Sequence, residues 1–258
     1  MDPTRCSDQP SVVIVGAGGH GRVVLDILLR AGTYRVDGFV DSNPNLHGRR
    51  MDGRTVLGDL SCLPRLRDEG LYGAVVAIGD NGVRREFADH VEEMELRLVN
   101  AIHPSAHLAH NVMLGKNIVI AAGALVCTHC QLGDSVILNT GCIVDHESKI
   151  GTAVHICPGA KLAGRVTVDS GAFIGIGATI IQNVRIGYEA VVGGGAVVIR
   201  DVSPMTTVVG VPARVIKDFA SVEEFAEWLL PEYVRAEPSG VTADDSAPER
   251  SRLPSATS

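Results

Sequence analysis

Aromatic side chains are scarce in this sequence of 258 residues: Phe, Tyr and Trp together make up 4 % of it. A long apolar stretch is also missing. No run of about 18 apolar residues occurs, which argues against a membrane-spanning helix. Basic residues are outnumbered, with 23 Lys and Arg against 30 Asp and Glu, and they form no polybasic cluster. A net charge of −7 without such a cluster argues against binding to nucleic acid through its phosphate backbone.

Cysteine is sparse as well, with six residues in the chain. The first ten residues, MDPTRCSDQP, are polar and lack the basic and apolar regions of a secretory signal peptide. We therefore expect a cytoplasmic protein whose cysteines stay reduced and occupy small apolar positions, without a disulfide framework.

What the sequence has in excess is glycine, at 29 residues, together with a strict six-residue repeat. From Leu108 to Val198 every sixth residue is Leu, Ile or Val, which makes sixteen positions in unbroken phase. The position four residues after each of these is mostly smaller, and Cys130 and Cys142 fall there. One large and one small buried position per hexapeptide is typical of a parallel β-helix, in which three hexapeptides form one coil. Aromatic rings do not fit inside so narrow a prism, which explains their scarcity.

The first hundred residues follow a different pattern. An apolar strand at 12–15 runs into GAGGHG at 16–21, a helix follows, and a second strand at 36–40 ends at Asp41. This is the arrangement of a nucleotide-binding βαβ unit, in which glycines let backbone N–H groups approach phosphates at the start of a helix. A purely structural tight turn is the alternative.

A further strand at 74–78 leads into Gly79 and Asp80 and then into a helix at 83–93. The whole segment amounts to little more than one mononucleotide-binding half, whereas a dinucleotide site needs two such halves. A nucleotide sugar or a single nucleotide therefore fits better than NAD.

Several stretches carry a resemblance to a known family. They are GAGGHG (16–21), FVDSNP (39–44), AIGDNGVRR (77–85), AIHPSA (101–106), ILNTGCIVDHE (137–147), GAKLAG (159–164) and the closing GVPAR (210–214). Together they resemble the nucleotide-sugar acetyltransferases of the hexapeptide-repeat superfamily, of the bacillosamine-pathway N-acetyltransferase and sialic-acid O-acetyltransferase type. The resemblance spans residues 11 to about 217. It implies a left-handed β-helix, an exception to the usual right-handed crossover.

The expected fold is therefore an α/β, Rossmann-like nucleotide-sugar-binding domain at 1–100, followed by an all-β left-handed parallel β-helix at 101–217. At 218–258 we expect a short helix and a disordered tail. Ser221 and Glu224 form a capping-box pattern at the start of that helix, and the Pro-, Ser- and Asp-rich remainder has few large apolar residues.

Acetyl transfer from a thioester to an amine needs a base for the proton of the amine and N–H donors for the tetrahedral oxyanion. His146, between Asp145 and Glu147, lies in the turn phase of its hexapeptide and should point outward. The resemblance makes His146 the general base and Glu147 the residue that orients it, and an ordinary surface histidine is the alternative. Coil stacking places Thr128, His146 and Gly164 in one column, so the Gly164 N–H is a candidate oxyanion donor.

Two groups of residues are expected to bind the substrates. The first group, expected to contact the nucleotide sugar, is Gly16, Gly18, Gly19, His20, Gly21, Asp41, Gly79, Asp80 and Arg84. The second group, expected to contact acetyl-CoA mainly on the strength of the resemblance, is Asn139, His155, Gly164, Ile176 and Gly194. Because the chain is acidic overall, an anionic ligand should be held by local backbone amides and by residues such as Arg84.

The resulting prediction is an acetyl-CoA-dependent N-acetyltransferase that acts on the amino group of a nucleotide-linked sugar of the 4-amino-4,6-dideoxy type, with no metal. O-Acetylation of a sialic-acid-like or other sugar hydroxyl is one alternative, and a non-catalytic nucleotide-sugar-binding protein is another. Zinc is disfavoured, because Cys127 and Cys130 form only half of a site and His103, His107 and His110 precede the first coils.

Charge is depleted in the repeat. Only 10 of the 92 residues at 108–199 are charged, against 43 of the other 166. A surface so poor in charge indicates a buried interface, and the resemblance implies a homotrimer with active sites between subunits.

Overall fold

The computed structural model of the chain describes residues 9–218. The helix and tail predicted from Ser221 onward lie outside the described residues. None of the helices within 9–218 combines the length and the apolar character that crossing a membrane requires.

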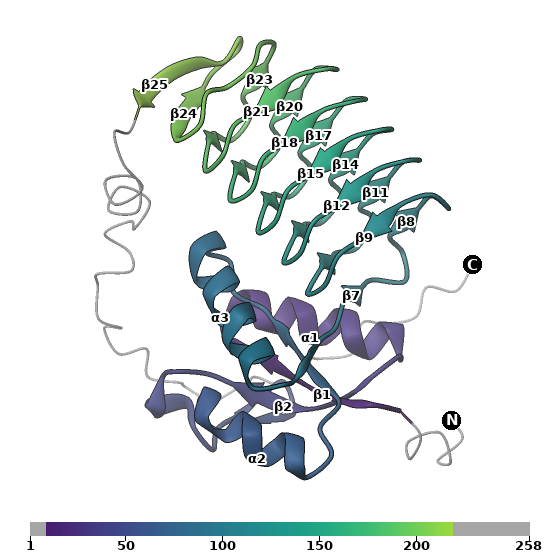
Figure 1. Cartoon of the computed structure of the whole chain (residues 1–258), viewed down its shortest axis with the longest axis vertical. Coiled ribbons are helices and arrows are strands. Elements are labelled where there is room, and N and C mark those ends of the chain that lie inside the picture. Colours follow the sequence, from purple (N-terminus) through teal and green to yellow (C-terminus); the bar gives the residue numbers. More distant parts are fainter. Residues whose placement is uncertain (1–8, 219–258) are drawn as a thin grey trace, which may run out of the picture. The chain divides into compact units, whose positions relative to one another are not determined.

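A six-stranded sheet forms the first part of the chain (Figure 1). Its order is β3-β4-β2-β1-β5-β6, and only the β3–β4 pair is antiparallel. The strands are β1 (Ser11–Val15), β2 (Arg35–Val40), β3 (Arg50–Met51), β4 (Arg54–Val56), β5 (Gly73–Val76) and β6 (Arg97–Leu98). The helices are α1 (Gly19–Ala31), α2 (Leu63–Asp68) and α3 (Asn81–Glu93), with short 3₁₀ turns at Pro44–Leu46 and Leu60–Cys62.

The predicted strand–loop–helix–strand unit is confirmed by β1, α1 and β2, and Rossmann-like topology follows from the parallel neighbours of β1. Two boundaries differ from the prediction. The strand predicted at 74–78 is β5, which ends at Val76, and α3 begins at Asn81, two residues earlier than expected. The earlier start has a physical cause: the Asp80 side chain accepts a hydrogen bond from the Val83 N–H at 2.8 Å and so caps the helix.

Close packing requires glycine in the loop between β1 and α1. A Cβ atom at Gly21 would lie 2.0 Å from the backbone oxygen of Gly16. No other residue fits at that distance, so the first turn of α1 can approach the end of β1 only with glycine at this position.

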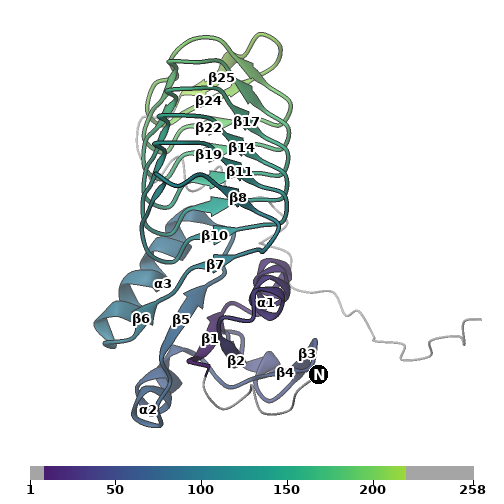
Figure 2. The same cartoon turned by 90° about the vertical axis from the view of Figure 1, so that its right-hand side faces the viewer.

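The second part of the chain is a parallel β-helix whose coils stack one on another (Figure 2). The first sheet contains β7 (Ala101–Ile102), β10 (Val119–Ile120), β13 (Ile137–Leu138), β16 (His155–Ile156), β19 (Phe173–Ile174), β22 (Val191–Val192), β24 (Thr206–Val209) and β25 (Arg214–Asp218). The second contains β8 (His107–Leu108), β11 (Leu125–Val126), β14 (Ile143–Val144), β17 (Lys161–Leu162), β20 (Thr179–Ile180) and β23 (Val197–Val198). The third contains β9 (Met113–Leu114), β12 (Gln131–Leu132), β15 (Lys149–Ile150), β18 (Thr167–Val168) and β21 (Arg185–Ile186).

The predicted period sets both the register and the core of this helix. Neighbouring strands pair residues that are 18 apart, such as Val119 with Ile137. The large and the small positions of the hexapeptides point inward, and Cys130 and Cys142 are buried among them. The core is almost entirely aliphatic, as the scarcity of aromatic residues predicted.

Three columns of turns form the corners of the prism. The first corner follows the first sheet and comprises 121–123, 139–141, 157–159, 175–177 and 193–195. The second corner follows the second sheet and comprises 109–111, 127–129, 145–147, 163–165 and 181–183. The third corner follows the third sheet and comprises 115–117, 133–135, 151–153, 169–171 and 187–189. Each corner presents a different set of side chains along the helix.

The N-terminal sheet domain packs against the first sheet and the third corner. Val119 and Ile137, on the outer face of the first sheet, share a core cluster with residues of β1 and α1 such as Ile27. At the third corner, Asn117 Oδ1 accepts the Val76 N–H at 2.8 Å. Residues 9–218 therefore form one compact unit, and domain boundaries at 100 and 217 stay predictions.

Candidate functional site

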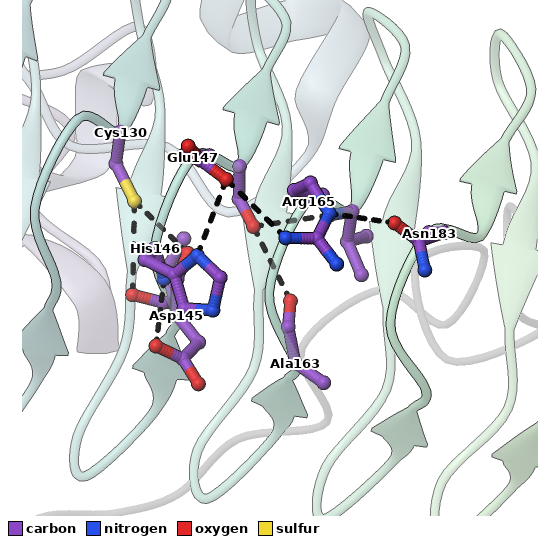
Figure 3. A network of polar contacts seen from close by, with 10 residues as sticks. Cys130, Asp145, His146, Glu147, Ala163, Arg165 and Asn183 are labelled. Carbon is purple, nitrogen blue, oxygen red and sulfur yellow. Dashed lines mark hydrogen bonds and ion pairs between the residues drawn. The ribbon is translucent and has the colours of Figure 1, made fainter.

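His146 and Glu147 lie on the second corner, in the turn that joins β14 to β15 (Figure 3). The His146 side chain is 43 % exposed, and its Nδ1 lies 3.4 Å from Glu147 Oε2. A carboxylate beside Nδ1 favours the tautomer with the proton on Nδ1, which leaves the lone pair of a general base on Nε2. Catalytic contacts of this kind are often long before substrate binds. The turn therefore presents an imidazole that faces outward, with Nε2 available as an acceptor.

Gly164 lies one coil further along, directly beside the imidazole of His146. A Cβ atom at this position would be 2.4 Å from Nε2 and 2.6 Å from Cε1 of that ring. Any side chain at 164 would displace the imidazole, so glycine here determines where that ring lies. The Gly164 N–H donates to no other described residue. It therefore remains available to a ligand.

Asp145 fixes the backbone of the same turn. Its Oδ1 accepts the His146 N–H at 2.7 Å, and this bond is the main reason why the pKa of the Asp145 carboxyl is lowered. Cys130 Sγ donates to the backbone oxygen of Asp145 at 3.1 Å, and Cys127 hydrogen-bonds to its carboxylate. Burial raises the pKa of both thiols, which keeps them protonated as donors. Sequence reasoning missed this role, because the repeat marks Cys130 only as a small buried residue.

Metal ligands do not gather at this turn or elsewhere in the described part of the chain. Within 9–218, no three His, Cys, Asp or Glu side chains are arranged to hold a metal ion. The thiols of Cys127 and Cys130 form hydrogen bonds to Asp145 instead.

The glycine loop presents open backbone at the start of α1. Gly18 caps this helix without a side-chain hydrogen bond, and a Cβ at Gly18 or Gly19 would meet no atom within 4 Å. The unpaired N–H groups of the first turn make such a helix end suitable for an anion. Asp41 supports the loop: its Oδ2 accepts the Ala17 N–H at 2.8 Å, and its Oδ1 accepts the Asn43 N–H at 2.9 Å. Asp41 thus supports the loop, and its predicted contact with the ligand stays a prediction.

Arg84, expected to hold an anionic ligand, is placed differently. Its side chain is fully buried, with 0 % exposure. Nε donates to Ser135 O at 2.8 Å and Nη2 to Ala153 O at 2.9 Å, while Nη1 donates to Ile78 O and Gly79 O at 3.0 and 3.1 Å. Burial lowers its pKa to about 10, so it stays charged at neutral pH. Arg84 therefore joins the loop after β5 to the β-helix, and ligand contact does not fit this position.

Gly79 and Asp80 are exposed at the end of this loop, close to the start of α3. A Cβ at Gly79 would meet nothing within 4 Å, whereas the Asp80 carboxylate is used as the helix cap. Asn81, which sequence reasoning overlooked, donates from Nδ2 to Gly171 O at 2.8 Å and accepts from Arg84 Nη2 at the same distance. These bonds hold the loop against the third corner and leave Gly79 open.

His20 and His155 bring the glycine loop and the β-helix together, with ring centroids 6.4 Å apart. His155 projects from β16, is 9 % exposed, and has its Nε2 3.3 Å from Asn139 Nδ2. Since Asn139 Oδ1 already accepts the Thr140 N–H, the amide group donates and His155 Nε2 accepts. Burial lowers the pKa of His155 to about 3 and that of His20 to about 4. Both rings are therefore neutral at pH 7.

This burial predicts a loss of stability in mild acid. The unfolded chain takes up a proton at His155 as the pH falls below about 6.5, whereas the folded chain does not do so until about pH 3. The free energy of unfolding should therefore fall by about 1.4 kcal/mol per pH unit between pH 6 and 4 on account of this residue. In urea titrations at several pH values, His155→Phe should reduce that slope and the exposed control His110→Asn should not. An equal slope in both variants would contradict the prediction.

Asn139, Ile176 and Gly194, expected to line the coenzyme groove, all lie on the first corner. Ile176 is 63 % exposed, and a Cβ at Gly194 would lie 3.1 Å from its Cγ2. The last residue of each turn on this corner is a glycine with positive φ: Gly123, Gly141, Gly159, Gly177 and Gly195. The corner is therefore a ridge with few side chains, which a long ligand or another chain can approach closely.

The predicted site residues form two separate groups within one chain. His146, Glu147 and Gly164 lie on the second corner, between the second and third sheets. His155 projects from the first sheet, close to His20. In a three-sided prism, that corner and that sheet lie on opposite sides of the aliphatic core. The structure therefore does not bring His146 and the glycine loop of one chain together.

A hollow of about 430 Å³ lies on the second corner, at the first coils of the β-helix. Its lining includes His110 and Asn111, two coils before His146, and Thr128 of the coil between, whose backbone oxygen accepts the Glu147 N–H at 3.0 Å. Gly164 lies against the imidazole of His146, and the residues that line the hollow lie one and two coils before it.

These features define an acyltransferase of the left-handed β-helix class with a Rossmann-like N-terminal domain. Residues 11–91 match the PglD N-terminal domain. PerB from Caulobacter crescentus, solved with CoA and GDP-perosamine, is 40 % identical with a TM-score of 0.77, and the match covers 80 % of this chain and 97 % of that one. The acetyltransferase domain of PglB from Neisseria gonorrhoeae, solved with acetyl coenzyme A, is 33 % identical with a TM-score of 0.75, over 81 % of this chain and 100 % of that one.

A curated relative agrees over a shorter stretch. UDP-N-acetylbacillosamine N-acetyltransferase of Bacillus subtilis is 33 % identical over 113 residues, or 43 % of this chain, and the match spans only 51 % of that relative. The chain belongs to the hexapeptide-repeat nucleotide-sugar acetyltransferase family.

Proposed function

We propose that this chain transfers the acetyl group of acetyl-CoA to the amino group of a nucleotide-linked sugar. The observation that carries the proposal is the second corner, where His146 has a carboxylate beside Nδ1 and Gly164 against Nε2. Among the relatives, PerB was solved with CoA and GDP-perosamine, and the Bacillus protein is an N-acetyltransferase by name. A 4-amino-4,6-dideoxy sugar is the acceptor that the sequence resemblance favours.

In the proposed reaction the amine nitrogen attacks the thioester carbonyl carbon, and the carbonyl oxygen takes up negative charge as the C–N bond forms. His146 Nε2 accepts the proton that the amine loses, and the Glu147 carboxylate stabilises the resulting imidazolium. The Gly164 N–H is the proposed donor to the oxyanion. Collapse of the tetrahedral intermediate then breaks the C–S bond, and the CoA thiolate leaves and takes the proton from His146.

We assign the nucleotide end of the acceptor to the glycine loop. Its phosphates would accept hydrogen bonds from the open N–H groups near Gly18 and Gly19, where the dipole of α1 also favours negative charge. Gly16 and Gly21 shape this loop, and Asp41 holds it through Ala17. The sugar end is assigned to the stretch of the second corner between the hollow at the first coils and His146.

We assign acetyl-CoA to the first corner, along Asn139, His155, Ile176 and Gly194. In its own chain, His146 is separated from the first-corner residues by the second sheet and from His155 by the core. The complete site therefore needs a second protomer. A neighbour that sets its first corner against the second corner would bring the two groups together, and three such contacts close a ring. We therefore propose a homotrimer, for which light scattering should give a mass of three chains. A monomer at micromolar concentration would contradict it.

The assay that tests the function is release of free CoA thiol with a panel of amino- and hydroxy-sugar nucleotides. We expect release only with acceptors that carry a free amino group. Release with the hydroxy-sugar nucleotides would favour O-acetylation instead. Binding of a nucleotide sugar without release from any acceptor would identify a non-catalytic binding protein.

A further inference from the structure

A column of polar side chains runs along the second corner past the catalytic turn. His129, Glu147, Arg165 and Asn183 occupy the same place in successive turns. All have positive φ, between 57° and 63°. Because their backbone conformations match and their coils stack at strand spacing, each side chain projects outward beside the one from the next coil. Contacts along the column are therefore set by which residue types follow one another.

Arg165 connects the two neighbours on either side of it (Figure 3). Its Nε donates to Asn183 Oδ1 at 2.7 Å, and its Nη1 lies 3.5 Å from Glu147 Oε2. The same Glu147 oxygen lies 3.4 Å from His146 Nδ1. Glu147 Oε2 thus faces both the His146 imidazole and the Arg165 guanidinium. On its other side, the guanidinium is held by the side-chain amide of Asn183.

We infer that Arg165 is a positioning residue, which holds the Glu147 carboxylate where it orients His146, and that Asn183 anchors Arg165 for this purpose. Glu147 is 51 % exposed, and a side chain with three rotatable bonds in that setting adopts many rotamers unless something restrains it. The two-point contact of Arg165 supplies that restraint. The inference rests on the proposed function, in which His146 is the base.

The geometry of the guanidinium matters as well as its charge. Arginine can direct Nε to Asn183 and Nη1 to Glu147 at the same time, because its donors form a rigid planar fork. Lysine presents one ammonium group and cannot make both contacts. Arg165→Lys should therefore restore only part of the activity that Arg165→Met loses.

A different role for Arg165 would be a direct contact with the phosphates of acetyl-CoA, since its side chain is 53 % exposed. The two roles have different kinetic signatures. A residue that acts through Glu147 affects kcat and has no effect once Glu147 is neutralised, whereas a coenzyme contact affects KM for acetyl-CoA and adds to the effect of Glu147→Gln.

The experiment compares Arg165→Met, Asn183→Ala, Glu147→Gln and the double variant Glu147→Gln/Arg165→Met in steady-state acetyl transfer. We expect kcat to fall about tenfold in Arg165→Met, with KM for acetyl-CoA unchanged. Asn183→Ala should cause a smaller fall. The double variant should be no slower than Glu147→Gln alone. Thermal melting of each variant separates these effects from loss of folding.

A matched control is Arg185→Met. Arg185 also makes an ion pair along the β-helix, with Nε 2.9 Å from Asp169 Oδ2, but it projects from the third sheet. Its loss should leave kcat unchanged.

Three outcomes would overturn the inference: an unchanged kcat in Arg165→Met, a raised KM for acetyl-CoA, or additive losses in the double variant. His146→Ala is assayed beside these variants. If it remains fully active, the proposed site itself is wrong; if it is inactive and Arg165→Met is normal, only the inference about Arg165 fails.

Discussion

His146→Ala is expected to lower acetyl transfer by roughly 10²–10⁴, the usual contribution of a general base. In the proposed mechanism the imidazole accepts the proton of the attacking amine, and alanine cannot do so. The side chain is 43 % exposed and lies outside the aliphatic core, so its removal should leave the fold and the melting temperature nearly unchanged. The measurement is kcat for thiol release, with binding of both substrates followed by calorimetry.

The matched control for this substitution is His129→Ala. His129 is exposed on the same corner one coil earlier, and its Nε2 lies 3.4 Å from Asn111 Nδ2. Its removal should not change kcat. Near-normal turnover in His146→Ala would remove the base from the proposed mechanism. A loss confined to KM would make His146 a binding residue instead.

His146→Ala, combined with a second inactive variant, also tests whether the site is shared between subunits. Gly18→Asp would place a negative charge at the start of α1, where the structure has open space, and should block the nucleotide phosphates without disturbing the fold. If the two inactive variants are dissociated and reassembled together, some interfaces combine an intact His146 with an intact loop. Random mixing in a ring should recover up to about a quarter of the wild-type activity. No recovery would place the whole site within one chain.

The repeat made part of this site predictable. In a β-helix of constant coil length, two residues that are 18 apart must be neighbours, as the pairing of Val119 with Ile137 illustrates. The position of Gly164 beside His146 therefore follows from the sequence alone, and the outward direction of His146 follows from its place in the hexapeptide. The aliphatic core is predictable for the same reason.

The six-residue repeat does not show which outer face of the β-helix packs against the N-terminal domain. Outward residues of the first sheet, such as Ile137, are of the same type as outward residues of the second sheet, such as Ile143. The packing of the N-terminal domain on the first sheet buries Ile137 fully, while Ile143 stays partly exposed. The burial of His155 beside His20 depends on that same docking, so its lowered pKa could not be expected from the repeat.

Arg84 and Arg85 illustrate the limit most clearly, because they are adjacent and alike in sequence. Arg85 is 41 % exposed and lies 3.9 Å from Glu189, whereas Arg84 is fully buried among backbone oxygens. One step along α3 turns a side chain by about 100° around the helix axis. Because of that step, Arg84 faces Ser135 and Ala153, whereas Arg85 lies at the edge of the contact between α3 and the β-helix.

Arg84→Met is expected to destabilise the protein by about 3–5 kcal/mol, because it leaves buried carbonyl groups without donors. The oxygens of Ser135 and Ala153 would be left without these partners on the β-helix side, and that of Ile78 on the side of the N-terminal domain. The melting temperature should fall by about 10 °C. Differential scanning calorimetry measures this directly, and urea titration gives the change in the free energy of unfolding.

Arg85→Met is the control, since a half-exposed ion pair at 3.9 Å contributes about 0–1 kcal/mol. The comparison also decides between the two roles considered for Arg84. If Arg84 has a structural role, Arg84→Met should have a lowered melting temperature. The affinity for the nucleotide sugar, measured well below that temperature, should change less than the stability does. If Arg84→Met instead kept its melting temperature and lost affinity for the nucleotide sugar, Arg84 would be a ligand-binding residue after all. Since the guanidinium donates to oxygens of both parts of the chain, stability is the property we expect to change.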